Sequence, residues 1–312
     1  MPDTMTPPAG PRPAGVHRAR RASRRWRPGL LTIASSLLAL VGLSVLLYPS
    51  AASWMSSYNQ SLLIEDMGRS LENASPGVDE QLSLAQRYNE ALSTGVNLDA
   101  NANVPTGSGT SSDASLRYED MLNTGSSDVM ARVRIPAIDV DLPIYHGTSD
   151  ETLLRGVGHL EGSSLPIGGA DTHSVLTAHR GLAQAEMFTN LDKVDVGDRF
   201  TIEVFGEVLT YQVRETKVVD PDDTDTLHAV AGEDLVTLVT CTPLGINSQR
   251  ILVTGERVTP TPIEDVQAAG QAPDIPGFPW WALIFGAGLL LIATYFWRSG
   301  YGDARRAAAR KR

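Results

Sequence analysis

The stretch TLVTCTPLGINSQRILVTG, residues 237–255, contains the only cysteine of the chain, Cys241. Its two apolar runs are separated by a polar break, a pattern that is typical of two strands joined by a turn. Cys241 ends the first run between Thr240 and Thr242, and Arg250 begins the second run. A strand pair of this kind lets Arg250 lie beside Cys241, at the end of the pair rather than in its middle.

This pairing favours a chemical role for the thiol over the commoner role of a buried structural cysteine. An arginine beside a thiol favours the thiolate and can hold a carbonyl oxygen as that oxygen becomes negative. A thiol nucleophile also needs a group that accepts and donates a proton, which is usually a histidine. A single cysteine excludes an intrachain disulfide and any CxxC metal or redox pair.

One histidine is placed in the sequence as the cysteine is. The run SVLTAHRG, residues 174–181, puts His179 at the end of an apolar strand, directly before Arg180. His146, in LPIYHG, is a weaker candidate for the same role. The other four are expected to be uninvolved, either in the basic N-terminal arm or as solvated or locally hydrogen-bonded side chains in polar loops: His17, His159, His173 and His228.

Two segments of eighteen residues without a charged side chain lie at 30–47 and 280–297. About 18–20 apolar residues suffice to cross the hydrocarbon core of a bilayer. Each segment has an arginine cluster between it and the nearer chain terminus, and the cytoplasmic flanks of membrane-spanning segments are enriched in Lys and Arg. We therefore expect two membrane passes, with both termini in the cytoplasm and residues 49–279 on the far side. A cleaved signal peptide is the alternative for the first segment.

The net charge of -10 averages unlike regions. Residues 1–28 and 298–312 are strongly basic, which leaves 13 basic and 34 acidic side chains between them. An acidic middle repels phosphates, so we expect no nucleic-acid partner. The sequence contains no recognisable metal cluster, phosphate loop or cofactor motif, and we expect neither a metal nor a cofactor.

From residue 130 onward, the sequence consists mainly of short runs that are typical of β-strands. The segment FTIEVFGEVLTYQV alternates about Phe205, Gly206 and Glu207 and predicts a hairpin. One short helix is expected at 181–194. Many short strands with few helices predict a closed or nearly closed β-barrel. The seven runs are residues 131–138, 142–147, 174–179, 199–204, 207–219, 235–241 and 250–258.

The segments around the barrel differ in composition. Residues 54–93 carry good helix formers broken at Ser75-Pro76-Gly77, whereas 94–115 are rich in Gly, Ser, Asn and Thr, as in a mobile loop or linker. The expected organisation is a cytoplasmic basic arm at 1–29, a transmembrane helix at 30–48, a helical stretch with a possible lid or linker at 49–128, the barrel at 129–258, a Pro-rich tether at 259–279, a transmembrane helix at 280–297 and a basic tail at 298–312.

These motifs together resemble one family. TLVTC at 237–241 resembles the TLxTC signature of sortases, LTAHRG at 176–181 their histidine motif, and QRILVTGER at 249–257 their arginine strand. Residues 135–169 are similar to the pilus-assembling class C sortases of Gram-positive bacteria, as are 188–194 and 218–227. The resemblance covers roughly 120–258.

The resemblance implies a fold and a site. The fold is mainly β: an eight-stranded sortase-type β-barrel with short helices, an N-terminal helical or lid segment and two flanking transmembrane helices. Cys241 would be the nucleophile, His179 the general acid and base, and Arg250 the group that binds substrate and oxyanion. Thr240, beside the nucleophile, is a further candidate for contact with substrate.

The resemblance also implies a reaction and its partners. A class C sortase at the cell membrane, with its catalytic domain outside, would cleave an LPxTG-like sorting signal between Thr and Gly, form a thioester, and transfer the acyl group to a lysine of a pilin subunit. Other LPxTG-bearing surface proteins would also be partners. Three alternatives stay open: a housekeeping sortase that uses cell-wall peptide amines, a membrane cysteine protease that uses water, and a surface scaffold without activity.

The lid is where this chain departs from the class C pattern. Class C sortases carry a lid before the barrel, with an Asp-Pro-aromatic motif that plugs the active site. In this sequence Asp99 is followed by Ala100 and Asn101. Residues 94–115 are therefore either a lid without that anchor or a linker.

Overall fold

The computed structural model describes residues 26–71, 76–92, 96–97, 106–107, 111–113, 115–123, 128–223, 225–271 and 276–309. They divide into two compact units. The smaller unit contains described residues from 26–44 and 284–309, and the larger contains those from 45–283. Each unit is described by itself below. Asp99 and most of the segment 94–115 lie outside the described residues.

The smaller unit is built from parts of two long helices, α1 (Leu30–Leu71) and α5 (Trp280–Ala309). Both helices are long and apolar enough to cross a membrane, as the sequence predicts. Both continue past the expected spans, since α1 runs through Pro49 to Leu71. Near the start of α1, the carboxylate of Asp303 accepts hydrogen bonds from the Gly29 amide at 2.9 Å and the Thr32 hydroxyl at 2.7 Å.

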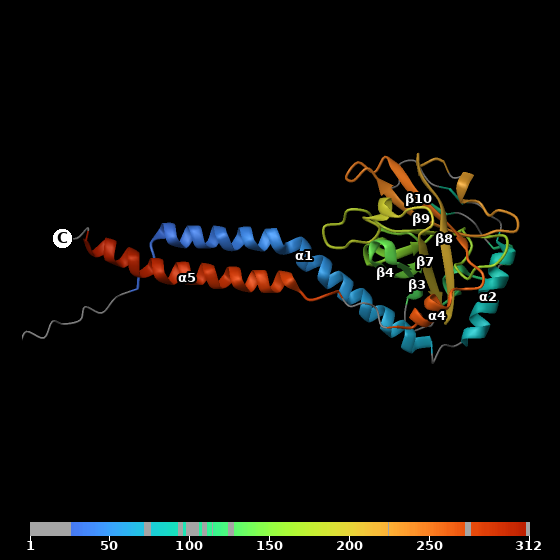
Figure 1. Cartoon of the computed structure of the whole chain (residues 1–312), viewed down its shortest axis with the longest axis horizontal. Helices are drawn as coiled ribbons and strands as arrows, with labels where there is room; N and C mark the ends of the chain where they lie inside the picture. The colour runs from blue at the N-terminus through green and yellow to red at the C-terminus, as the bar shows by residue number, and fades with distance from the viewer. Residues whose placement is uncertain are drawn as a thin grey trace, which may run out of the picture. The chain divides into compact units, whose positions relative to one another are not determined.

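The larger unit contains a closed eight-stranded barrel, as predicted, in the order β10-β8-β7-β3-β4-β5-β6-β9 (Figure 1). Two neighbouring pairs, β4–β5 and β6–β9, are parallel and the others are antiparallel. The strands are β3 (Val129–Ile135), β4 (Val140–His146), β5 (Val157–His159), β6 (Thr172–Thr177), β7 (Arg199–Val204), β8 (Glu207–Val219), β9 (Asp234–Thr242) and β10 (Gln249–Arg257).

The predicted hairpin joins β7 to β8 by a two-residue turn. Val204 pairs with Glu207, and Phe205 and Gly206 between them have φ values of 45° and 85°. Positive φ at both central positions is the geometry of a turn whose twist matches that of the strands. Gly206 adopts such a φ without steric cost, while Phe205 is held there with its ring buried in the core.

The helix expected at 181–194 is wrong. Only Leu191–Lys193 forms a single 3₁₀ turn (η3), and Leu182 pairs with Ala185 in an isolated bridge. Tertiary contacts override the helix propensity, because the Phe188 amide donates to the His179 carbonyl at 3.1 Å. A short helix lies instead at α3 (Asp150–Arg155), where the Ser149 hydroxyl accepts from the Thr152 amide at 3.1 Å.

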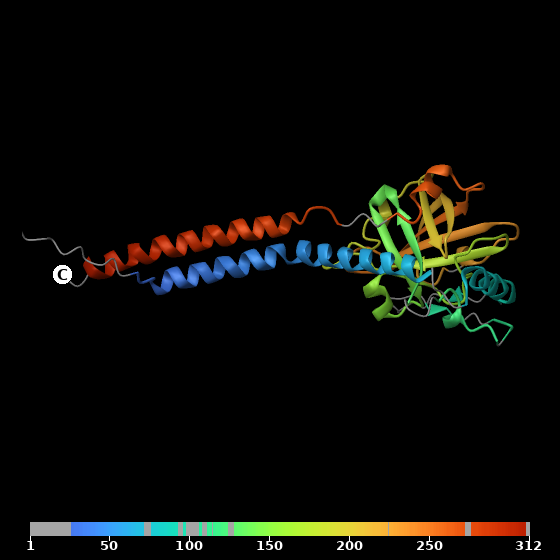
Figure 2. The ribbon, with the colours of Figure 1, turned by 90° about the horizontal axis from the view of Figure 1, so that it is seen from below.

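The helical stretch before the barrel forms as expected, with a break between α1 and α2 (Val78–Ala91). Figures 1 and 2 show α2 against the barrel, where Ala85 and Tyr88 join its core. The remaining described elements around the barrel are β1 (Val96–Asn97), β2 (Thr106–Gly107), η1 (Tyr118–Asp120), η2 (Pro136–Ile138), η4 (Asp225–Leu227) and α4 (Ile263–Ala268).

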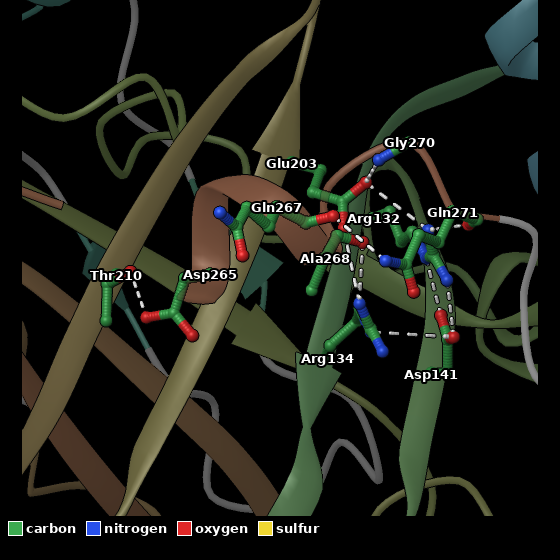
Figure 3. Close-up of polar contacts among 10 residues, drawn as sticks. All are labelled: Arg132, Arg134, Asp141, Glu203, Thr210, Asp265, Gln267, Ala268, Gly270 and Gln271. Atoms are coloured by element: carbon green, nitrogen blue, oxygen red, sulfur yellow. Dashed lines mark hydrogen bonds and ion pairs between the residues drawn. The ribbon is translucent and has the colours of Figure 1, made fainter. Parts of the chain in front are cut away.

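Part of the segment after the barrel is fixed to it by two arginines of β3. Arg132 is buried, makes a two-pronged ion pair with Asp141, and donates to the Gln271 carbonyl at 3.0 Å. Arg134 donates to the Ala268 carbonyl at 3.1 Å, at the end of α4. Figure 3 shows both guanidinium groups directed toward this segment. The described residues 263–271 are therefore docked against the barrel wall.

Candidate active site

Two candidate residues come from the adjacent strands β9 and β10, and the third, His179, follows the end of β6. Arg250 is the direct partner of Cys241 in the antiparallel pair β9–β10, as the sequence predicts. On the other side of β9, strand β6 runs parallel, with Thr177 opposite Val239. The Ala178 amide extends this ladder by donating to the Val239 carbonyl at 3.2 Å. If this register is continued by two residues, it predicts that His179 lies beside Cys241.

Cys241 and Arg250 belong to the outer face of the barrel wall, and alternation from Val175 of the outer cluster predicts the same face for His179. Leu176, Leu238 and Ile251 belong to the main core, whereas Val239 and its partner Leu252 belong to a separate apolar cluster. Because side chains alternate along a strand, Cys241 and Arg250 continue the outer row. The outer cluster consists of Leu160, Val175, Val219, Leu227, Val239 and Leu252.

Thr240 lies on the inner face and is 1% exposed. Its hydroxyl donates to the Ala178 carbonyl at 2.8 Å. This bond joins the residue before Cys241 to the residue before His179. In place of the substrate contact expected from the sequence, we therefore propose that Thr240 positions the two strand ends.

Arg250 is held by the turn between β9 and β10. The side chain is buried, and its Nη1 donates to the carbonyls of Asn247 at 2.9 Å and Gln249 at 3.1 Å. These contacts fix one side of the guanidinium. A planar group fixed in this way can present its other donors in a defined direction.

Burial governs the titration of the thiol and the imidazole. It raises the pKa of the half-buried Cys241 thiol, and the positive charge of Arg250 acts in the opposite direction. It lowers the pKa of His179, and the carboxylate of Asp150 opposes that change. Both effects of burial favour the neutral forms of the two groups.

The other histidines of the barrel are engaged elsewhere. His146 pairs through Nε2 with the Met121 carbonyl at 2.7 Å. His159 and His173 are buried in strands rather than placed in polar loops, contrary to the prediction, although both are locally hydrogen-bonded. His228 is exposed. His17 lies outside the described residues.

Two neighbours of the site were missed by the sequence analysis. Asp150 opens α3 and acts electrostatically on His179. Arg180 follows His179 directly, and its Nη1 donates to the Thr242 hydroxyl at 2.7 Å. Strand alternation could have pointed to Arg180, because the residue after His179 is expected on the opposite face of an extended chain.

The family model of the sortase domain matches residues 133–258. Sortase C-1 from Actinomyces oris has 46% sequence identity and a TM-score of 0.52, over 58% of this chain and 97% of that structure. A sortase C from Streptococcus pneumoniae, whose structure is described as informative on pilin substrate specificity, has 42% identity and a TM-score of 0.52, over 60% and 90%. The chain belongs to the sortase family, and these structural neighbours are of class C.

A curated relative, sortase D from Bacillus subtilis, is 32% identical over 130 residues. That match covers 41% of this chain and 63% of the relative. The chain therefore spans a little under two thirds of the length of that protein.

Proposed function

We propose that this protein is a membrane-anchored cysteine transpeptidase of the class C type, which joins the threonine of a sorting signal to a lysine amine of a pilin subunit. The observation that carries the proposal is the direct pairing of Arg250 with Cys241 in β9–β10, with His179 two residues beyond the end of β6, the strand on the other side of β9. That arrangement combines a nucleophile, a proton carrier and a cationic donor set.

In the first half-reaction, the Cys241 sulfur attacks the carbonyl carbon of the threonine in an LPxTG-like signal, and the thiol proton passes to His179. The carbonyl oxygen becomes an oxyanion, which the guanidinium of Arg250 stabilises. When the C–N bond breaks, His179 returns the proton to the leaving glycine nitrogen. The product is a thioester between Cys241 and threonine.

In the second half-reaction, a lysine amine attacks the thioester carbonyl and loses a proton to His179. The C–S bond breaks, the proton returns to the sulfur, and an isopeptide bond remains. The energy of the original peptide bond is conserved through the thioester, so the transfer needs no ATP. The acceptor amine competes with water for the thioester, which favours a partly shielded sulfur.

The resemblance of the barrel to class C sortases, of which one is discussed for pilin specificity, supports the pilin acceptor. The two apolar helices support a membrane-anchored protein with its barrel outside the cell. Other LPxTG-bearing surface proteins would use the same acyl site. A cell-wall peptide amine is the acceptor of the second candidate function, a housekeeping sortase, and water is the acceptor of a protease.

An acceptor competition distinguishes these functions. The full-length protein in detergent would receive a labelled LPxTG-like peptide together with a lysine-bearing pilin domain, a cell-wall peptide amine, or neither. The proposal expects an isopeptide-linked product with the pilin domain in excess of hydrolysis. A product formed mainly with the cell-wall amine would indicate a housekeeping sortase, and hydrolysis alone would indicate a protease.

A further inference from the structure

Arg180 makes three directed contacts directly beside the proposed site. Its side chain is 9% exposed. Nη1 donates to the Thr242 hydroxyl at 2.7 Å, Nε donates to the Thr189 carbonyl at 3.1 Å, and Nη2 lies 2.9 Å from the Asp192 carboxylate. Three acceptors, each held by a different nitrogen, suit the fork of donors that a guanidinium presents.

A second hydrogen bond joins the same two segments as the contact between Arg180 and Thr242. Thr242 follows Cys241, and Arg180 follows His179. One step earlier, the Thr240 hydroxyl donates to the Ala178 carbonyl at 2.8 Å. The two inner-face bridges therefore join the ends of β6 and β9 on either side of the positions that carry His179 and Cys241.

The same arginine fixes the loop that follows. Arg180 itself donates to the Thr189 carbonyl. In addition, the Thr189 hydroxyl accepts a hydrogen bond from the Gly181 amide at 3.0 Å. The Phe188 amide donates to the His179 carbonyl at 3.1 Å. The backbone on both sides of Arg180 is thus tied to residues 188–192, which replaces the helix expected from the sequence.

We propose that Arg180 is a positioning residue that holds the imidazole of His179 in register with the thiol of Cys241 by clamping Thr242 to the 189–192 loop. This inference rests on the proposed function. By strand alternation, the Thr242 side chain that Arg180 holds lies on the face opposite that of Cys241. Asp192 compensates its charge, so its effect on the reaction is geometric. A misplacement of about 1 Å costs on the order of 10²-fold in rate.

The test measures thioester formation by the full-length protein in detergent, with a labelled LPxTG-like peptide. Arg180→Gln keeps a donor but loses the fork, and we expect kcat to fall about 10- to 100-fold with KM unchanged. Arg180→Lys should recover part of kcat through one remaining contact. Thr242→Val should lower kcat in the same way. The double variant Arg180→Gln/Thr242→Val should be no worse than Arg180→Gln alone, since both remove one coupled contact.

A matched control is Arg214→Gln. Arg214 lies in strand β8, and the substitution removes its ion pair with Glu233, in which the two charged groups are 2.7 Å apart. Its kcat should stay at the wild-type value. The inference is overturned if Arg180→Gln keeps its kcat, if it changes KM alone, or if Arg214→Gln loses as much activity at an equal loss of melting temperature.

A second readout separates this inference from the proposed function. The rate at which iodoacetamide alkylates Cys241 would be followed against pH in wild type, Arg180→Gln and His179→Ala. We expect the Arg180→Gln profile to move from the wild-type profile toward that of His179→Ala, even with no peptide present. If it overlays the wild-type profile, Arg180 does not position His179. If wild type forms no thioester but the profiles move as expected, the proposed function fails and the positioning role stands.

Discussion

Arg250 lies directly opposite Cys241 in the pair β9–β10, and its guanidinium donates to the carbonyls of Asn247, in the turn that joins those strands, and of Gln249, the first residue of β10. These two backbone contacts help to orient the guanidinium, and its positive charge acts on the neighbouring sulfur. A guanidinium in this position suits a developing oxyanion.

Arg250→Lys should abolish most of the activity. A lysine ammonium is a point charge that cannot keep the two carbonyl contacts and also bind an oxyanion. Loss of one oxyanion donor costs roughly 10²–10³ in kcat, and the assay is cleavage of an LPxTG-like peptide. Arg257→Lys is the matched control, because Arg257 is on the same strand and its Nη1 donates to the Val258 carbonyl at 2.7 Å. Near-normal cleavage by Arg250→Lys would remove the assigned role.

Arg250→Gln should raise the pKa of the Cys241 thiol further. Burial already raises that pKa, and Arg250 lowers it, so removal of the charge leaves burial unopposed. Alkylation by iodoacetamide reports this thiol alone, since the chain contains one cysteine. The inflection of rate against pH should move upward in the variant. An inflection that stays in place or moves downward would contradict the electrostatic account.

Thr240→Val distinguishes positioning from substrate contact. The change keeps the shape and removes the hydroxyl that donates to the Ala178 carbonyl. We expect a loss of about 0.5–1.5 kcal/mol in the free energy of unfolding, and a lower kcat at constant KM. Thr254→Val is the control, because Thr254 is also buried and its hydroxyl bonds to that of Thr237 elsewhere in the barrel. A raised KM with normal kcat in Thr240→Val would favour the substrate contact first expected.

Alternation and turn chemistry made much of the barrel predictable. The hairpin at Phe205-Gly206 and the pairing of Arg250 with Cys241 both follow from local pattern. Strand β5 was missed because its three residues, Val157–His159, are too few to show alternation, and it is completed only by its neighbours β4 and β6. The segment 181–194 misled because its helix formers are held by contacts of His179 and Arg180 that no local pattern encodes.

The sequence indicated the residue types of the site but not their support. The sequence makes Cys241, His179 and Arg250 the candidates because a thiol nucleophile needs a base and a cation near it, and all three stand at the ends of apolar runs. The clamp formed by Arg180, Thr242 and Asp192 depends on three segments that meet only in the folded barrel. Asp99 and most of the segment 94–115 lie outside the described residues, so the lid stays a prediction.

Buried His159 should make the barrel sensitive to acid. Its ring contacts the Tyr118 hydroxyl and the Ser164 carbonyl, and burial lowers its pKa from 6.5 to about 4. Below pH 6.5 the unfolded chain binds a proton at this histidine that the folded chain refuses, so stability falls as the pH drops toward 4. One such group contributes a slope of up to about 1.4 kcal/mol per pH unit.

Urea unfolding between pH 7 and pH 5 measures this slope. His159→Gln should be less stable at pH 7 and should lose less stability on acidification than wild type. His228→Gln is the control, since the His228 side chain is exposed, and the bond with the ring of His173 is made by the His228 carbonyl, which the substitution keeps. Equal slopes in wild type and His159→Gln would show that another group causes the acid sensitivity.

The central claim is that Cys241 forms a thioester with the threonine of a sorting signal. Intact-protein mass spectrometry, after incubation of the full-length protein with an LPxTG-like peptide, tests it most directly. The account predicts a mass gain equal to the acyl portion ending in threonine, located on Cys241, reversed by hydroxylamine and absent from Cys241→Ala. Peptide cleavage by Cys241→Ala at the wild-type rate, or wild-type protein that neither gains mass nor cleaves the peptide, would contradict the account.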